Sequence, residues 1–151
     1  MGAGEITMQF STEKGFGSWL IRYLSDGDYS HVDIVLQNGR LGARLKGGVT
    51  VRPPDYATFT VTKRMTVQVP NYNAAMAYAY AQVGKPYAIM AIVDFFLHRR
   101  KPLEKNPKAW FCDQLAYAIC MAGGVELLAT DNPDNLTPYE LSLSPLLKEV
   151  E

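Results

Sequence analysis

Cysteine is scarce in this chain of 151 residues, which contains only Cys112 and Cys120. Two cysteines cannot form the disulfide framework of a small secreted domain, nor a zinc site of four thiolates. If both lie on one helix, a rise of about 1.5 Å per residue separates them by roughly 12 Å, whereas a disulfide needs Cα atoms within roughly 7 Å. We therefore expect two free thiols, no metal and no cofactor.

Excess charge and long apolar runs are also absent. The 15 Lys and Arg residues balance 15 Asp and Glu residues, so the basic excess typical of nucleic-acid-binding proteins is missing, and we expect no nucleic-acid partner. The longest apolar run that contains no tyrosine, residues 88–93, is far shorter than the ~20 residues of a membrane-spanning helix. No basic and then apolar leader opens the chain, so we expect synthesis in the cytoplasm without a signal peptide.

The composition is that of a folded domain. Hydrophobic residues make up 48% of the chain and charged residues 20%, which argues against intrinsic disorder. The length suits one domain, and we expect a single domain over residues 1–151 with residues 1–4 disordered.

Hydrophobic patterning predicts strands first and helices afterwards. We expect strands over residues 5–10, 30–36, 41–45, 49–51 and 58–69, and helices over 19–24, 74–83, 87–97 and from 111 to 123. Ser11-Thr12 would cap the first helix, Asn38-Gly39 would form a hairpin turn, and Asn71 or Asn73 would cap the helix after Pro70. This segregation indicates an α+β fold in which an antiparallel sheet packs against helices.

Cys112 and His31 form the most informative pair in the chain. Cys112 lies in the first turn of a predicted helix, where unpaired backbone N–H groups and the helix dipole favour a thiolate. His31 begins a strand, and imidazole is the side chain suited to taking a proton from a thiol near neutral pH. Each residue could instead be structural, as we expect for Cys120 in the middle of the helix. Their occurrence together in one α+β domain predicts a nucleophile and a base.

Asp33 is the candidate for orienting the imidazole, because residues two apart on a strand share a face. Its alternative role is an ion pair with Arg44 across the hairpin, which a two-residue Asn38-Gly39 turn would allow. A three-residue loop over 37–39 would shift the register by one residue and take Arg44 off that face. The sequence leaves both registers open.

Several motifs in order resemble one family. They are Asp28-Tyr29-Ser30-His31-Val32-Asp33-Ile34-Val35, Gly47-Gly48-Val49, Gly84-Lys85-Pro86-Tyr87, Trp110-Phe111-Cys112-Asp113-Gln114-Leu115 and Thr137-Pro138-Tyr139-Glu140-Leu141. Over residues 5–141 they are similar to the circularly permuted branch of the NlpC-type, papain-like cysteine peptidase superfamily. This branch includes YiiX-like proteins and the lecithin:retinol acyltransferase group, in which the histidine precedes the cysteine.

The resemblance implies a papain-like fold with Cys112 as nucleophile and His31 as base. Family members usually carry a third polar residue about a dozen positions after the histidine, here near Ala43, which cannot orient an imidazole. Asp33 is therefore the substitute. Asp113-Gln114 also departs from the Ser-Glu that more often follows the family's cysteine, although an acid in the first helical turn is favourable.

The implied activity is that of a thiol hydrolase, which cleaves an amide bond through a thioester acyl-enzyme. The expected substrate is a peptide or acyl compound such as a peptidoglycan stem peptide, cleaved by a cell-wall amidase or endopeptidase of phage or bacterial type. Tyr29, Tyr87 and Gln114 are candidates for the second oxyanion donor or for lining the cleft.

Two alternatives remain at this point. One is a lipid or amine acyltransferase of the same fold, and the other is a catalytically inactive binding or structural module, for instance of a phage particle. The apolar segment 88–97 followed by basic residues 98–101 would suit an anionic membrane surface. A core helix with a solvated charged loop accounts better for the same pattern, so we do not expect membrane contact. The sequence leaves the oligomeric state open.

Overall fold

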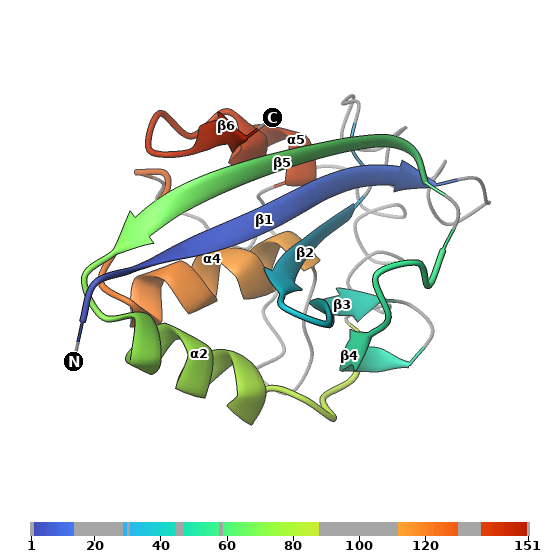
Figure 1. Ribbon diagram of the computed structural model, residues 1–151, viewed down its shortest axis with the longest axis horizontal. Helices are drawn as coiled ribbons and strands as arrows, with labels where there is room; N and C mark the ends of the chain where they lie inside the picture. Colours follow the sequence, from blue (N-terminus) through green and yellow to red (C-terminus); the bar gives the residue numbers. More distant parts are fainter. Residues whose placement is uncertain are drawn as a thin grey trace, which may run out of the picture.

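The computed structural model of the chain describes residues 2–13, 29, 31–44, 47–57, 59–87, 112–129 and 137–150. Its elements are β1 (Gly4–Glu13), β2 (His31–Leu36), β3 (Gly39–Arg44), β4 (Gly48–Arg52), β5 (Phe59–Val69), α2 (Tyr72–Ala81), α4 (Cys112–Ala122), α5 (Pro138–Ser142) and β6 (Lys148–Val150). The strands form one six-stranded antiparallel sheet in the order β4-β3-β2-β1-β5-β6 (Figure 1). The predicted α+β class is confirmed, with three helices among the described residues.

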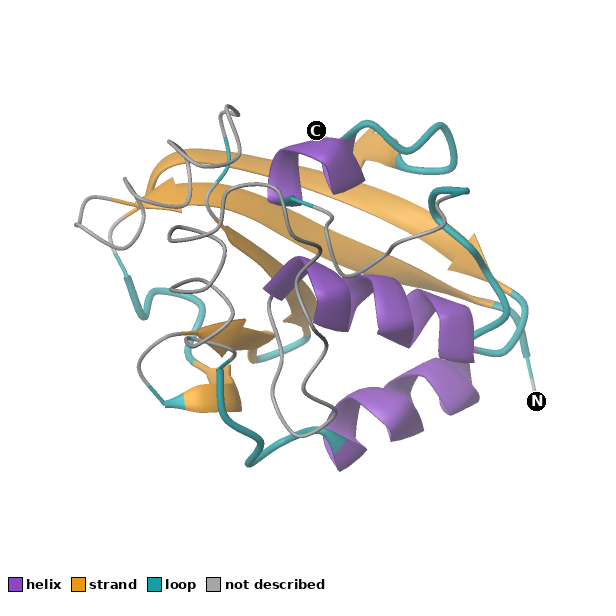
Figure 2. Cartoon of the chain, turned by 180° about the vertical axis from the view of Figure 1, so that it is seen from behind, coloured by secondary structure: helices purple, strands orange, loops and turns teal. Residues whose placement is uncertain are grey.

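The helices α2 and α4 cover one side of the sheet. They lie in front of the strands in Figure 2 and behind them in Figure 1. Alternate residues of β1 (Ile6, Met8 and Phe10) are almost completely buried and share one core with Leu115 and Ile119 of α4. Because side chains alternate along a strand, the residues between them point to the other face.

The cap of α2 follows from local chemistry. The side chain of Asn71 accepts a hydrogen bond from the Ala74 N–H at 2.9 Å, which satisfies one of the unpaired donors at the helix start. Asn71 was one of the two predicted caps, although the helix begins two residues earlier than predicted. Gly84, predicted to stop this helix, has a φ of +98°, a conformation that other residues rarely adopt.

The β2–β3 hairpin differs from both predicted registers. Its turn is formed by Gln37 and Asn38, and Leu36 pairs with Gly39, the first residue of β3. Gly39 has no positive φ and is needed for a close approach instead, because a Cβ there would lie 2.8 Å from the Arg52 carbonyl oxygen. Glycine therefore allows β3 to begin beside β4, and the Asn38-Gly39 turn was a wrong prediction.

Two further details of the strands differ from the predictions. Ser11 and Thr12 do not cap a helix, because both continue β1 and pair with β5. The edge strand β6, which pairs with β5, was not predicted, since its three residues are too few for a periodic signal. The predicted helix over 19–24, all but the first residue of the predicted helix over 87–97, and the basic residues 98–101 lie outside the described residues. In the described part of the chain, no helix has the length and apolar character needed to cross a membrane.

Candidate active site

The candidate site forms where the start of α4 meets the start of β2. Cys112 is the first residue of α4 and is 3% exposed, and its thiol is not in a disulfide. His31 is the first residue of β2 and is also buried. The two side chains are close enough for the charge and hydrogen-bonding capacity of the Cys112 thiol to raise the pKa of His31. The fold therefore brings together the two residues singled out from the sequence, at the start of α4 and the start of β2.

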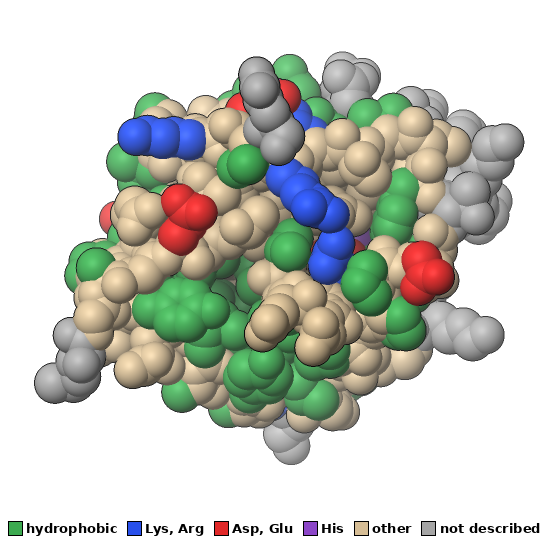
Figure 3. Space-filling view, viewed as in Figure 1, with side chains coloured by type: hydrophobic (Ala, Val, Ile, Leu, Met, Phe, Trp, Pro, Cys, Tyr) green, Lys and Arg blue, Asp and Glu red, His purple; other side chains and the backbone are tan. Residues whose placement is uncertain are grey.

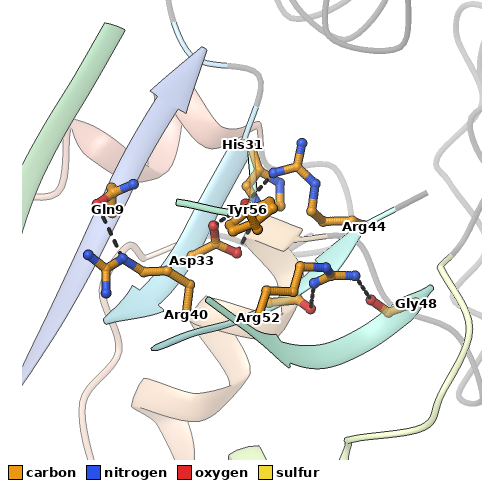
Figure 4. A network of polar contacts seen from close by, with 9 residues as sticks. Gln9, His31, Asp33, Arg40, Arg44, Gly48, Arg52 and Tyr56 are labelled. Carbon is orange, nitrogen blue, oxygen red and sulfur yellow. Dashed lines mark hydrogen bonds and ion pairs between the residues drawn. The ribbon is translucent and has the colours of Figure 1, made fainter. Parts of the chain in front are cut away.

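Asp33 holds the other side of the imidazole. Its Oδ1 lies 2.7 Å from His31 Nε2, and both side chains are buried (Figure 4). Because Asp33 engages Nε2, Nδ1 is the nitrogen left to face the Cys112 thiol. The three residues thus form the series thiol, imidazole, carboxylate.

Electrostatics favour a charged His31–Asp33 pair. Burial alone would lower the pKa of His31, but the charges of Asp33 and Cys112 and hydrogen bonds to both raise it to about 10. Burial would raise the pKa of Asp33, yet the charge of His31 and hydrogen bonds with His31 and Tyr56 hold it below its usual value. At neutral pH the imidazole is therefore protonated and the carboxylate ionised.

A divergence of two strands makes room for this pair. Pairing between β2 and β3 ends at Ile34 and Leu41, although β3 continues beside β4 as far as Arg44. Gly42 lies beside Asp33, and a Cβ on Gly42 would come within 2.0 Å of Asp33 Oδ1. The absence of a side chain at Gly42 thus leaves the space that the Asp33 carboxylate occupies.

Tyr56 holds the second oxygen of the Asp33 carboxylate. Its hydroxyl donates to Asp33 Oδ2 at 2.6 Å and accepts a hydrogen bond from Arg44 Nη1. The Arg44 guanidinium also lies 4.7 Å from the centre of the Tyr56 ring, a cation–π distance. In Figure 4 Tyr56 stands between Arg44 and Asp33. The Arg44 side chain therefore contacts Tyr56. Within the part of the chain that the structure describes, the ion pair between Arg44 and Asp33, which the sequence left open, is not formed.

Asp113 is a buried carboxylate next to the thiol. Its Oδ2 has no hydrogen-bond partner among the described residues. Burial raises the pKa of Asp113 to about 7, although hydrogen bonds from its own N–H and that of Gln114 partly oppose the shift. A proton on Asp113 therefore relieves an otherwise unpaired buried charge.

The three candidate lining residues are placed differently. Tyr87 is buried, and burial together with the charges of Cys112 and Asp113 raises its pKa well above the ordinary value. Gln114 is buried in the first turn of α4. Tyr29 packs its ring on Phe10, with centroids 5.7 Å apart. Of the three, Tyr87 is the one whose pKa is raised by the charge of Cys112.

Gly42 and Tyr56 were not foreseen from the sequence. Gly42 is one residue before Ala43, the position where the family's third residue was sought, and its lack of a side chain is what matters. Tyr56 follows the turn after β4, and no periodicity or spacing connects it with Asp33. Only the folded chain brings them to the carboxylate.

Comparison with known proteins gives a structural relative. No family model matches the sequence, and no curated protein matches it. A solved structure described as the metalloprotein YiiX of Escherichia coli O157:H7 is similar, with a TM-score of 0.64 over 97% of this chain and 95% of that chain. The two sequences are 13% identical, so the similarity shows the fold alone. The chain thus has a YiiX-like α+β fold.

Proposed function

We propose that the chain is a thiol hydrolase of the permuted, NlpC-type papain-like kind, with Cys112 as nucleophile, His31 as base and Asp33 as the residue that orients the base. The observation that carries the proposal is the buried His31–Asp33 contact of 2.7 Å, together with a helix-start cysteine, Cys112, that also raises the pKa of the same imidazole. A buried, protonated imidazole next to a thiol supports a thiolate–imidazolium pair.

The proposed reaction needs two acyl transfers. The Cys112 thiolate attacks the carbonyl carbon of an amide, and the carbonyl oxygen takes the negative charge. His31 then donates its proton to the leaving amine as the C–N bond breaks, which leaves a thioester on Cys112. His31, now neutral, takes a proton from water, whose oxygen attacks the thioester; the C–S bond breaks, the acid leaves, and the Cys112 thiolate and the protonated His31 are restored.

The oxyanion would be held at the start of α4. The backbone N–H of Cys112 lies in the first turn, where N–H groups have no partner within the helix. Tyr87 is the candidate second donor, because its buried hydroxyl is protonated at neutral pH and its pKa responds to the charge of Cys112. Following the motif resemblance, we propose a cell-wall peptide as the acyl donor and water as the acceptor.

The YiiX relative is described as a metalloprotein, which raises the question of a metal here. The described residues contain no group of three or more His, Cys, Asp and Glu side chains placed to share an ion. His31 Nε2 is already engaged by Asp33. This donor set does not fit a metal site, and the proposed reaction uses none.

Alkylation by iodoacetamide tests the proposal, with modified sites mapped by mass spectrometry. At about pH 6 to 7 we expect Cys112 to react at least about 100-fold faster than Cys120, which serves as an internal control in the same molecule. The His31→Ala variant should lose most of the Cys112 reactivity at this pH, while Cys120 is unaffected.

As a control, circular dichroism and thermal unfolding must show that the His31→Ala variant keeps the fold of the wild-type protein. Equal, slow reaction of both thiols, unchanged by His31→Ala, would overturn the proposal and favour a binding or structural module. If the thiol is reactive, release of free amine from stem peptides, compared with acyl transfer from lipid esters, decides between hydrolysis and acyl transfer.

A further inference from the structure

A row of polar side chains crosses three strands on the face of the sheet opposite α2 and α4. Gln9 of β1 is paired with Asp33 of β2 on one side and with Arg64 of β5 on the other. Paired residues on neighbouring strands point to the same face. Arg40 of β3 joins this row, since its Nε donates to Gln9 Oε1 at 3.3 Å (Figure 4).

Two guanidinium groups converge on one neutral acceptor in this row. Arg64 Nε donates to the same Gln9 Oε1 at 3.4 Å, so Arg40 and Arg64 share a single amide oxygen. The other hydrogen bond of Arg40 is to the Gly39 carbonyl at 2.8 Å. Among the described residues, neither guanidinium forms an ion pair with a carboxylate.

Burial makes this arrangement unusual. Arg40 is 5% exposed and Gln9 is 4% exposed, and buried arginines are normally paired with an acid. Burial and the positive charge of Arg64 together lower the pKa of Arg40. Asp33 is the nearby acid, but its two oxygens are taken up by His31 and Tyr56. Within the described ranges, the two positive charges are thus held together without a dedicated counter-ion.

We propose that Arg40, Arg64 and Gln9 form an oxyanion-binding subsite that takes a carboxylate or phosphate group of a ligand. A guanidinium has five N–H donors, and Arg40 uses only Nε and Nη1 on described residues. The remaining donors of Arg40 and of the exposed Arg64 are suited to the bidentate geometry of a carboxylate or phosphate.

Arg64 gives ligands access to the subsite, because it is exposed whereas Arg40 and Gln9 are buried. A row of Lys and Arg side chains crosses the middle of the sheet face that is turned away from the helices (Figure 3). Gln9 is the strand neighbour of Asp33, so a ligand anchored here lies next to the residues that support His31. The subsite goes beyond the proposed hydrolase activity and does not depend on it.

The test is a titration of the full chain with inorganic phosphate and, separately, with succinate. Binding is measured as a change in the midpoint of thermal unfolding, and sodium chloride keeps the ionic strength constant. We expect a saturable rise of the midpoint with at least one of the two anions. Arg64→Gln, a change at an exposed residue, should weaken the apparent affinity at least about fivefold. Arg40→Gln should do the same if the variant folds.

Lys63→Gln is the matched control. It removes the same charge from the same strand, but Lys63 is paired with Phe10 and therefore lies on the other face, where it contacts Glu149 at 3.2 Å. Unchanged affinity in Lys63→Gln supports the subsite. Equal losses in Lys63→Gln and Arg64→Gln, or an equal rise with chloride alone, would show general charge screening and overturn it.

The two anions also separate the possible ligand sources. Tighter binding of succinate indicates an acidic peptide or organic acid, and tighter binding of phosphate indicates a phosphorylated ligand; either supports the subsite. Repeating the titration with Cys112→Ala separates this proposal from the previous one, because anion binding should persist in a protein that cannot be alkylated at residue 112.

Discussion

Cys112 and Cys120 lie on the same helix, both buried and both unpaired, yet their surroundings differ completely. Burial alone raises the pKa of Cys120 to about 12, which keeps it a neutral thiol. Cys112 is at the helix start, close enough to His31 to raise the pKa of that imidazole. Both residues are buried, so exposure does not distinguish them. The difference is that the His31–Asp33 pair lies next to Cys112 and not next to Cys120. The following changes should weaken or sharpen that contrast.

Asp33→Asn should have the largest effect, because it removes the counter-charge of the buried His31. Loss of one partner of a buried ion pair costs about 3–5 kcal/mol in the free energy of unfolding. We also expect Cys112 to be alkylated more slowly, toward the rate of Cys120. Urea unfolding of the wild-type protein and of Asp33→Asn measures the first effect, and alkylation with mapped sites measures the second.

The pH dependence of that stability difference identifies its source. The raised pKa of His31 stabilises the fold fully below 6.5, and this contribution is lost as the pH rises through about 10. The lowered pKa of Asp33 contributes above 3.8 and is lost as the pH falls. The difference between wild type and Asp33→Asn should be widest between these two values, at roughly pH 4 to 6.5, and shrink toward pH 10. A difference that does not change with pH would contradict the ion pair.

Gly42→Ala should disturb the same carboxylate from the neighbouring strand. The new methyl group would lie 2.0 Å from Asp33 Oδ1, so the carboxylate must move away from His31. We expect a loss of about 1–3 kcal/mol in unfolding free energy and slower Cys112 alkylation. In an Asp33→Ala background the clash is absent, so Gly42→Ala should cost clearly less there. Equal costs in both backgrounds would show that Asp33 is not what the glycine accommodates.

Asp113→Asn should change stability in the opposite direction. Because the pKa of Asp113 is raised from 3.8 to about 7, the folded state retains a proton that the unfolded state loses, and stability falls as the pH rises through this range. The neutral side chain should stabilise the protein by about 1–2 kcal/mol above pH 8, with no gain near pH 4. Thermal unfolding at both pH values measures this, with Asp55→Asn on an exposed loop as control. A gain of equal size at both pH values would exclude ionisation as the cause.

Sequence patterns were sufficient for most of the sheet and for α2 and α4. Strands β1, β2, β4 and β5 have enough alternating residues to show their period, and Asn71 carries its own capping chemistry. The position of the β2–β3 turn could not be predicted, because Asn38-Gly39 favours a turn by itself while contact with Arg52 of β4 draws Gly39 into the strand. The turn preference of Asn38-Gly39 was thus overridden by a contact with a residue of another strand.

The site was predictable only as far as local geometry reaches. His31 and Asp33 are two residues apart on one strand, so their proximity follows from the strand period alone. Cys112 was associated with them by its position at a helix start and by motif order. Gly42 and Tyr56 act through tertiary contacts, one by leaving space and one by a hydrogen bond across 23 positions, and neither leaves a signal in the sequence.

Tyr56→Phe should give the smallest effect and the sharpest test of how the carboxylate is held. It removes the 2.6 Å hydrogen bond to Asp33 Oδ2 but leaves the 2.7 Å contact between Asp33 and His31 in place. We expect a loss of about 1 kcal/mol in unfolding free energy, since a single buried hydrogen bond contributes about that much. The pKa of His31 should fall below about 10, because a less firmly held carboxylate supports the imidazolium less well. An NMR titration can follow this directly, since the chain has two histidines. Tyr80→Phe, at a tyrosine that is 52% exposed on α2, is the matched control. If both variants leave the His31 titration unchanged, Tyr56 merely covers Asp33; if Tyr56→Phe alone shifts it, the support of His31 extends beyond Asp33 to Tyr56.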